Sequence, residues 1–316
     1  MNRSAQRVID APVLVLIGPT AIGKTALSLE LANRFDCEII SVDSMQVYRH
    51  MDIGTAKPST KERARVVHHL IDVIDPDEQF DSAQFVRLAL AALDQIIRTG
   101  RIPLLTGGTG LYLKALIHGL FDHETTADKS VREDLAQQLA NEGSAKLYAW
   151  LQKIDPETAS RIHPNDTQRL LRSLEIFLVS GRPWSQHLQE QASPPLRFNK
   201  MLQLGLNCDR RLLYERIDKR SELMFRTGMV QEVEKLRQMG YGSSLSSMQS
   251  IGYRHVNNYI DGVWSMEETM RLLTRDTRRY AKRQLTWFGS DPALRWFDRS
   301  AIGEVVNITD KWLRDR

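Results

Sequence analysis

The chain has 316 residues and a mass of 36.2 kDa, a length that suits one large domain or two ordinary ones. Hydrophobic residues make up 42% and charged residues 26%, which excludes a disordered or fibrous chain. Two cysteines are too few for a disulfide framework or a cysteine zinc site. The low cysteine count makes a reducing cytoplasm the expected location, and the apolar run at 13–17 is too short to cross a membrane.

Short apolar strands alternate with helices in the first 120 residues. The predicted strands cover 13–17, 38–42 and 102–106, and the predicted helices cover 24–35 and 82–99. Ser82 is the expected N-cap of the second helix, and Gly100 its stop. This alternation predicts an α/β fold, with a parallel sheet that carries helices on both faces.

The pattern changes after Leu120. Residues 128–191 show helical periodicity and no convincing strand, with Pro156, Pro164 and Pro183 near expected helix starts. A linker is expected at 193–195, a strand at 201–206 and helices over 209–287, and the tail from Asp291 has no clear pattern. We therefore predict a core of residues 1–120 and 198–316, interrupted by a helical insertion at 121–197.

A phosphate-binding motif follows the first strand. Its eight residues fit G-x-x-x-x-G-K-[ST] between a strand and a helix: Gly18, Pro19, Thr20, Ala21, Ile22, Gly23, Lys24 and Thr25. Backbone N–H groups and the helix N-terminus bind phosphate oxygens in such a loop. Lys24 then supplies a positive charge and the Thr25 hydroxyl a ligand for Mg²⁺. The motif indicates a di- or triphosphate ligand, and a kinase or nucleotide hydrolase is its commonest context.

Two further strand ends carry candidate site residues. Asp43 follows the strand at 38–42, where a carboxylate can bind Mg²⁺, act as a general base or cap a turn. Gly107-Gly108-Thr109-Gly110 follows the strand at 102–106; this run suits either close approach to a ligand or a tight turn into a helix. The eight histidines show no zinc-ligand spacing, and the acidic residues around Pro76 suit a turn better than a metal cluster.

Basic residues concentrate toward the C-terminus, within a net charge of +4. From Lys200 onward there are 21 basic and 15 acidic residues. One helical stripe consists of Arg271, Arg275, Arg278, Arg279 and Lys282, close to Arg283 and Trp287-Phe288. Such a stripe is typical of a nucleic-acid surface, although a solvated face paired to Glu268 and Asp276 explains it equally well.

A second basic group contains Arg210, Arg211, Arg216 and Arg220. Because they lie one helical turn apart, Arg216 and Arg220 share a face. They can bind a diphosphate, or they can pair with Glu215 and Asp218.

Taken together, these motifs resemble the tRNA dimethylallyltransferases, which attach an isopentenyl group to the adenosine beside the tRNA anticodon. The matching strings are GPTAIGKT (18–25), SVDSMQVYRHMDIGTAKP (41–58), HHLIDVIDP (68–76), GGTGLYLKAL (107–116), IHPNDTQRLLRSLEIF (162–177), IGYR (251–254) and AKRQLTWF (281–288). They spread over nearly the whole chain, and MDIGTAKP is absent from ordinary P-loop kinases. Eukaryotic relatives append a Cys/His zinc finger that this chain lacks, so the resemblance is to the compact bacterial form.

The resemblance implies roles for individual residues. Asp43 is then the general base, and Lys24, Thr25, Thr109 and Arg216 contact the diphosphate or Mg²⁺. The segments that match tRNA-contact segments contain Asp43, Ser44, Met45, Gln46, Gln168, Arg169, Leu170, Leu171, Arg172, Gln249, Ser250, Ile251, Gly252, Tyr253, Arg254, Lys282, Arg283, Gln284, Leu285, Thr286, Trp287, Phe288 and Gly289. Arg132 and Thr109 join this tRNA-binding set.

The function implied is transfer of a dimethylallyl group from dimethylallyl diphosphate to N6 of the adenosine 3′ to the anticodon. The partners implied are this diphosphate and the tRNA anticodon stem-loop, with Mg²⁺ as cofactor; no feature indicates a protein partner. Two enzymatic alternatives are an ATP-dependent small-molecule kinase and an isopentenyltransferase that acts on free adenylate. The basic stripe and the helical insertion favour tRNA over both, and a non-catalytic RNA-binding protein would not need the P-loop.

Overall fold

The computed structural model describes residues 7–119, 129–190 and 196–315, which form two compact units. The core unit contains 7–117 and 196–315, and the helical unit contains 118–119 and 129–190. Within the described part of the chain, no helix is both long enough and apolar enough to cross a membrane.

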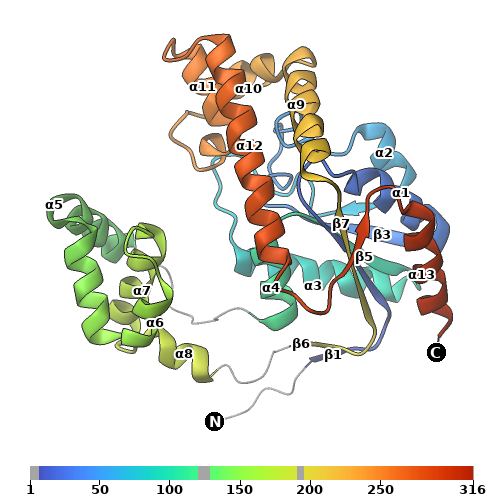
Figure 1. Ribbon diagram of the computed structural model, residues 1–316, viewed down its shortest axis with the longest axis horizontal. Coiled ribbons are helices and arrows are strands. Elements are labelled where there is room, and N and C mark those ends of the chain that lie inside the picture. Colours follow the sequence, from blue (N-terminus) through green and yellow to red (C-terminus); the bar gives the residue numbers. More distant parts are fainter. Residues whose placement is uncertain (1–6, 120–128, 191–195, 316) are drawn as a thin grey trace. The chain divides into compact units, whose positions relative to one another are not determined.

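The core unit is built on a six-stranded sheet in the order β4-β3-β5-β2-β7-β8, in which all neighbours are parallel. Its strands are β2 (Val13–Ile17), β3 (Cys37–Val42), β4 (His68–His69), β5 (Ile102–Gly107), β7 (Met201–Asn207) and β8 (Arg295–Asp298). The N-terminal strand β1 (Arg7–Ile9) pairs separately with β6 (Leu196–Phe198), again in parallel. The predicted parallel α/β class is confirmed (Figure 1).

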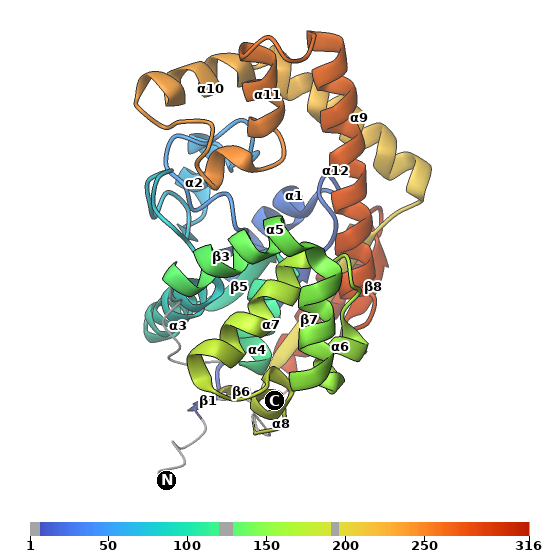
Figure 2. The same ribbon diagram turned by 90° about the vertical axis from the view of Figure 1, so that its left-hand side faces the viewer.

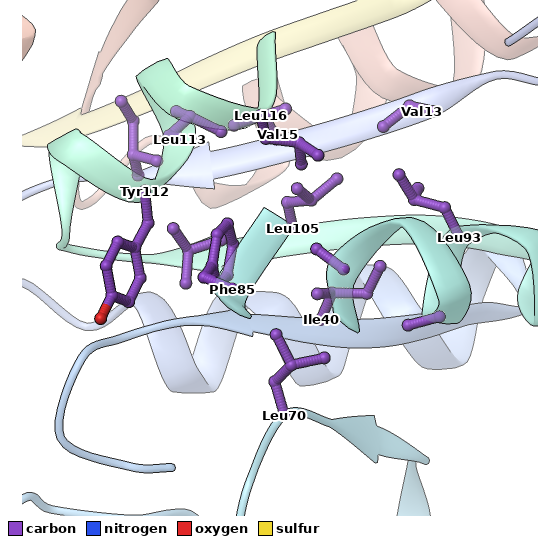
Figure 3. Close-up of a cluster of buried hydrophobic side chains, with 14 of the residues drawn as sticks. Val13, Val15, Ile40, Leu70, Phe85, Leu93, Leu105, Tyr112, Leu113 and Leu116 are labelled. Carbon is purple, nitrogen blue, oxygen red and sulfur yellow. The ribbon is translucent and has the colours of Figure 1, made fainter. Parts of the chain in front are cut away.

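Helices cover both faces of this sheet. The side chains of β2, which point alternately to the two faces, show why. Val13, Val15 and Ile17 belong to one buried cluster, which includes side chains of α3 (Ser82–Arg98) and α4 (Gly110–His118) (Figure 3). Leu14 and Leu16 belong to a second cluster on the other face, with α1 (Lys24–Phe35), α9 (Arg210–Arg226) and α13 (Ile302–Arg314). Because successive side chains in a strand point to opposite faces, a strand buried on both faces is apolar throughout.

The remaining helices of the core unit are α2 (Thr60–Arg65), α10 (Met229–Gln238), the 3-10 helix η1 (Ser247–Gln249), α11 (Tyr253–Ile260) and α12 (Met266–Phe288). A third cluster contains buried side chains of α9, α10, η1 and α11. The apolar side chains of α10 and α11 pack against Val47, Tyr48 and Met51 in the loop after β3. Helices α9 and α12 lie side by side in both ribbon views (Figure 2).

The helical unit contains α5 (Lys129–Ile154), α6 (Pro156–Arg161), α7 (Thr167–Ser180) and α8 (Trp184–Glu190). Gly143 interrupts the helical geometry of α5 with φ 77°. The three prolines lie at or just before helix starts, as predicted, and Pro156 is the first residue of α6. The linker expected at 193–195 lies outside the described residues.

Candidate active site

The phosphate-binding motif forms the loop between β2 and α1, at the carboxyl edge of the sheet. Ala21 and Gly23 have positive φ angles of 65° and 113°, which curl the backbone toward the start of α1. Lys24 opens the helix, and its Nζ donates to the carbonyl oxygens of Gly18 and Pro19 at 2.9 Å each. Glycine at the N-cap leaves the first N–H groups of α1 without a side-chain cap, which suits an anionic ligand.

A cavity of about 440 Å³ lies over this loop. Four cationic side chains line it: Lys24, Arg216, Lys219 and Arg220. Among its described lining residues Asp43 is the one carboxylate. Such an excess of positive charge in a confined space favours a multiply charged anion. We call this space the P-loop cavity.

Helix α9 supplies the arginines. The Nε of Arg216 donates to the carbonyl oxygen of Ala21 at 2.7 Å, so this side chain is fixed to the loop itself. The alternative pairing with acidic neighbours is wrong, because Asp218 pairs with Arg278 and Glu215 lies 3.8 Å from Arg211. Within the second basic group, Arg216 and Arg220 therefore line the P-loop cavity, whereas Arg210 and Arg211 do not.

Confinement changes the acid–base chemistry of the cationic groups. Burial, followed by the charge of Arg220, lowers the pKa of Lys24 to about 7, and Asp43 opposes the change. Burial also lowers the pKa of Arg220, again against Asp43. Two cations are thus held close together at a cost in free energy that a bound anion would relieve.

Asp43 follows the last residue of β3 and caps the turn that begins there. Its Oδ1 accepts hydrogen bonds from the backbone N–H groups of Met45 at 2.8 Å and Gln46 at 3.3 Å. The predicted role of Asp43 as a turn cap is therefore confirmed. It does not exclude a chemical role, because the same carboxylate faces the cationic groups of Lys24 and Arg220.

A second cavity of about 300 Å³ adjoins the first and shares Thr20, Asp43, Thr55, Arg220 and Tyr280 with it. The rest of its wall is richer in apolar side chains, namely Met45, Ile217, Met224, Ile251 and Leu273. We call it the apolar cavity. The arrangement places a carboxylate on the common wall between a cationic space and an apolar one.

Thr109 lies in neither cavity lining. Its Oγ1 accepts a hydrogen bond from the N–H of Ser44 at 3.1 Å, and its hydroxyl also bonds to Tyr280. Burial, followed by the charge of Asp43, raises the pKa of Tyr280 to about 12. These contacts make Thr109 a link between the ends of β3 and β5 and the helix α12.

The glycines after β5 are explained by close packing. A Cβ on Gly108 would lie 2.1 Å from Nε2 of Gln284. That nitrogen donates to the carbonyl oxygen of Gly108 at 2.9 Å, while Oε1 of the same side chain accepts from the N–H of Thr20 at 2.8 Å. Gly107 and Gly108 also line the P-loop cavity. These glycines therefore both form a tightly packed turn and line the cavity.

The MDIGTAKP string forms a loop held by a carboxylate of α10. Glu232 accepts hydrogen bonds from the N–H groups of Asp52, Ile53 and Gly54 at 2.7–3.1 Å, and from the Tyr253 hydroxyl at 2.6 Å. A Cβ on Gly54 would lie 2.5 Å from the Tyr253 ring. The MDIGTAKP loop and the IGYR segment, which are far apart in sequence, therefore pack against each other.

Lys57 fixes the other end of this loop. Its side chain is 1% exposed and bonds to Asp52 and Asp72 at 2.6 Å each, and to the carbonyl oxygen of Tyr48 at 2.8 Å. Asp72 belongs to the acidic segment around Pro76, so one of these carboxylates binds a lysine. No group of three or more metal-ligating side chains occurs among the residues that the structure describes.

The C-terminal candidate segment, 282–289, does not present a single face. Lys282 points away from the cavities, Arg283 lines the apolar cavity, and Gln284 lines the P-loop cavity. Phe288 is buried in the core at 3% exposure, whereas Trp287 is 38% exposed. Consecutive residues of a helix differ by about 100° in direction, so a matching string cannot all contact one ligand.

The remaining candidates of this segment are distributed in the same way. Leu285 packs against the second core cluster, the Thr286 hydroxyl donates to the carbonyl oxygen of Lys282, and Gly289 ends α12. Of the earlier segment, four residues line the apolar cavity: Ser250, Ile251, Gly252 and Tyr253. Gln249 donates to the carbonyl oxygen of Ser243, and Arg254 pairs with Asp276.

In the helical unit, Arg132 of α5 and Arg172 of α7 bind the same carboxylate. Glu175 is 4% exposed and lies 2.6 Å from Nε of Arg132 and 2.8 Å from Nη1 of Arg172. Gln168 and Arg169 are exposed at the start of α7, and Leu171 is partly buried. Leu170 is fully buried in the core of the unit, so its side chain supports α7 and is not on the surface.

Three residues of this site were not among the candidates: Tyr280, Glu232 and Lys57. Arg220, by contrast, was considered together with Arg216 because the two lie one helical turn apart. Tyr280 lies one turn before Gln284, on the face of α12 opposite the basic stripe. Glu232 binds backbone N–H groups of a loop far along the chain, whereas Lys57 bonds to Asp52, to Asp72 and to the carbonyl oxygen of Tyr48. No local pattern indicates such contacts.

A P-loop at the edge of a parallel α/β sheet, facing a cationic cavity, defines the class of P-loop phosphate-binding proteins. The family model described as IPP transferase matches residues 46–291. The chain therefore belongs to the IPP transferase family, and the resemblance to the tRNA dimethylallyltransferases is confirmed.

Two curated relatives, both named tRNA dimethylallyltransferase, show how closely the chain resembles this family. The protein of Desulfotalea psychrophila is 52% identical over 98% of each chain. That of Acetivibrio thermocellus is 45% identical over 94% of each chain.

Solved structures agree. A tRNA isopentenylpyrophosphate transferase from Bacillus halodurans has a TM-score of 0.70 at 39% identity, covering 98% of this chain and 97% of that one. A eukaryotic dimethylallyltransferase, described as acting on tRNA, has a TM-score of 0.83 at 28% identity, covering 97% and 80%.

Proposed function

We propose that this enzyme transfers a dimethylallyl group from dimethylallyl diphosphate to the N6 amine of the tRNA adenosine 3′ to the anticodon, with release of diphosphate. Family membership and the names of the relatives support the reaction class. The observation that carries the assignment is the common wall of the two cavities, which holds Asp43, Arg220 and Tyr280. A tRNA substrate also supports a cytoplasmic location.

The diphosphate belongs in the P-loop cavity. Lys24, Arg216 and the N–H groups at the start of α1 converge there. They stabilise the negative charge that develops on the leaving group as the bond from the allylic carbon to oxygen breaks. Lys219 and Arg220 add to the same field. Thr109, which contacts Ser44 and Tyr280, is placed to position this wall.

The donor set also fits Mg²⁺. The Thr25 hydroxyl lines the cavity beside Lys24, and hydroxyl and phosphate oxygens are the ligands that Mg²⁺ prefers. We assign Thr25 as the residue that would hold the ion together with diphosphate oxygens. When bound, the ion supplies further neutralisation of the leaving group.

The apolar cavity suits a hydrocarbon chain and a flipped adenine. As the adenine nitrogen attacks the allylic carbon, a C–N bond forms and the C–O bond to diphosphate breaks. The amine must also lose a proton, and Asp43 on the common wall is placed to accept it. An adenine stacked in RNA cannot reach such a wall, so we expect the base to be flipped out.

The RNA contacts are assigned by position. Ser250, Ile251 and Arg283, at the apolar cavity, are placed to contact the adenosine and its neighbours. In the helical unit, Gln168, Arg169, Arg132 and Arg172 present polar groups from α5 and α7. Gln46 and Ser44 belong to the turn that Asp43 caps, so we expect them to order the Asp43 side of the wall.

One experiment tests the whole assignment. The protein is incubated with Mg²⁺, dimethylallyl diphosphate and unmodified tRNA, and nucleosides are analysed by mass spectrometry. We expect prenylated adenosine with no ATP present. Prenylation of free AMP in preference to tRNA would support the adenylate alternative, and acceptor-stimulated ATP hydrolysis would support a kinase.

A further inference from the structure

Helices α9 and α12 each have two faces that carry charged side chains. One face of each helix lines the cavities described above, with Arg216 and Arg220 on α9 and Tyr280 and Gln284 on α12. The opposite faces line a separate groove between the same two helices. A residue at the active site and one in the groove therefore lie about half a helical turn apart on each helix.

This groove has a volume of about 700 Å³ and is strongly basic. Its described lining contains six cations, namely Arg210, Arg271, Arg275, Arg278, Arg279 and Lys282. It contains two carboxylates, Asp218 and Glu222. The basic stripe of α12 and part of the basic group of α9 thus meet on one surface, which sequence spacing alone does not show.

The cations in the groove are held in place. The ring of Tyr214 has the guanidinium carbons of Arg210 and Arg278 each 5.1 Å from its centroid. Nε of Arg210 donates to the Tyr214 hydroxyl at 3.0 Å, and Nε of Arg278 donates to Asp218 at 3.1 Å. Each guanidinium carries five N–H donors, so these contacts orient the groups and leave donors for a ligand.

Asp276, which is not part of the groove lining, likewise holds Arg275 in place. The carboxylate of Asp276 is 12% exposed and accepts from Nε of Arg275 at 2.9 Å and from Arg254 at 2.6 Å. Arg279 is 64% exposed and lies 3.7 Å from Asp276. Arg271 pairs with Glu268 at 2.7 Å. The expected pairing to Glu268 and Asp276 is therefore confirmed, but it fixes the stripe in place without neutralising the groove.

We propose that this groove is a second RNA-contact surface, which binds the phosphodiester backbone of tRNA outside the anticodon loop. The proposal rests on the proposed function, because it supposes that the substrate is tRNA. From Arg271 to Lys282 the stripe extends about 16 Å along α12, which is long enough for more than one phosphate. Planar guanidinium groups bind phosphate oxygens in pairs.

The groove cannot serve the target nucleotide itself. A helix is about 10 Å thick with its side chains, and α9 and α12 both stand between the groove and the cavity wall. A flipped adenosine on that wall therefore leaves the groove to a more distant part of the same RNA. The groove should add affinity for long substrates and leave the chemical step unchanged.

The test uses the double variant Arg210→Gln/Arg278→Gln. Both residues line the groove and neither lines the cavities at the P-loop. The matched control is Arg211→Gln/Lys235→Gln, which removes the same charge from exposed positions outside the groove lining. Binding of full-length tRNA and of a short anticodon-loop RNA is measured across a salt series by fluorescence anisotropy, and prenyl transfer is measured in parallel.

For full-length tRNA we expect the groove variant to weaken binding by about tenfold. The slope of log affinity against log salt should fall by about two, since two phosphate contacts are lost. Affinity for the loop RNA, kcat and KM for dimethylallyl diphosphate should stay as in the unmodified protein.

Three outcomes would overturn the proposal. They are unchanged binding of full-length tRNA, an equal loss for the loop RNA, and a loss matched by the control variant. Thermal unfolding of both variants shows whether either is misfolded, and the single variant Arg210→Gln then serves as the milder substitution. Failure of the unmodified protein to prenylate any tRNA would instead count against the proposed function, because groove binding is measured without turnover.

Discussion

Gln284 holds the P-loop at Thr20: its Oε1 accepts the backbone N–H of Thr20 at 2.8 Å, although the two residues are 264 positions apart. The other end of the same amide donates to Gly108. A single side chain from α12 thus sets the separation of two loops on the edge of the P-loop cavity.

We expect Gln284→Glu to weaken diphosphate binding by about tenfold or more. The carboxylate can still accept from Thr20, but it cannot donate to Gly108 and its charge repels a diphosphate. Isothermal titration with dimethylallyl diphosphate measures the effect. Gln231→Glu, at an exposed position, adds the same charge elsewhere; equal weakening in both variants would contradict the local role.

Asp43→Asn separates the turn cap from the proposed base. Asparagine keeps an oxygen that can accept from Met45 and Gln46, but it cannot take a proton. We expect the single-turnover transfer rate to fall by about 10²–10⁴-fold while tRNA and diphosphate still bind. A rate that added Mg²⁺ partly restores would indicate a metal ligand instead.

A matched control for this variant exists at the start of α3. Asp81 accepts from the N–H of Gln84 at 2.9 Å as an N-cap, so Asp81→Asn tests capping alone. If Asp43→Asn lost no more activity than Asp81→Asn, Asp43 would be a cap only, with a stability cost of a few tenths of a kcal/mol.

Lys24 should take up a proton when diphosphate binds. Its pKa is about 7 in the free protein, and an adjacent anion raises the pKa of an ammonium group. At pH 8 binding should therefore take up close to one proton, and affinity should fall as the pH rises above 7. Titrations in buffers of different ionisation enthalpy measure the uptake, and Lys24→Met should abolish it.

Loss of this charge should also slow the chemistry. We expect Lys24→Ala to reduce the transfer rate by about 10²–10³-fold, as for other donors that face a leaving group, with tRNA affinity nearly unchanged. Normal turnover at saturating diphosphate would refute the assignment of the P-loop cavity.

Glu232→Ala should destabilise the protein by about 2–3 kcal/mol. It would leave the N–H groups of Asp52, Ile53 and Gly54 without their acceptor, together with the buried Tyr253 hydroxyl. Urea unfolding measures the change. Glu234→Gln, on the exposed side of the same helix, should change stability by less than about 0.5 kcal/mol.

Asp276 should make a contribution to the free energy of unfolding that depends on pH. Burial alone would raise its pKa, but hydrogen bonds from Arg275 and Arg254 outweigh burial and lower the pKa to about 2. The contribution, about 2 kcal/mol, is present above pH 4 and lost as the pH falls toward 2. The stability difference between the unmodified protein and Asp276→Asn should shrink over that range.

The sequence predicted those elements of the fold that are determined by residues close together in the chain. The strands at 13–17 and 102–106 and the helix at 24–35 match β2, β5 and α1 to within one residue. The N-cap of α3 is Asp81, not the expected Ser82; both residue types cap helices, so the pattern allowed either.

The rest depended on distant contacts. β4 has two residues and β1 and β6 three each, and each strand is defined by a partner far along the chain. The tail that showed no pattern forms β8 and α13, and β8 pairs with β7. In the site, the P-loop was readable because its spacing is local, whereas the contacts of Gln284, Glu232 and Tyr280 exist only in the folded chain.

Under the proposed mechanism, the two oxygens of Asp43 have different roles. Oδ1 accepts from the N–H groups of Met45 and Gln46, so the proposal assigns Oδ2 as the oxygen that takes the proton from the substrate. A protonated carboxyl group still accepts hydrogen bonds at its other oxygen. The turn can therefore persist through every catalytic cycle, and the segment after β3 need not refold between one RNA molecule and the next.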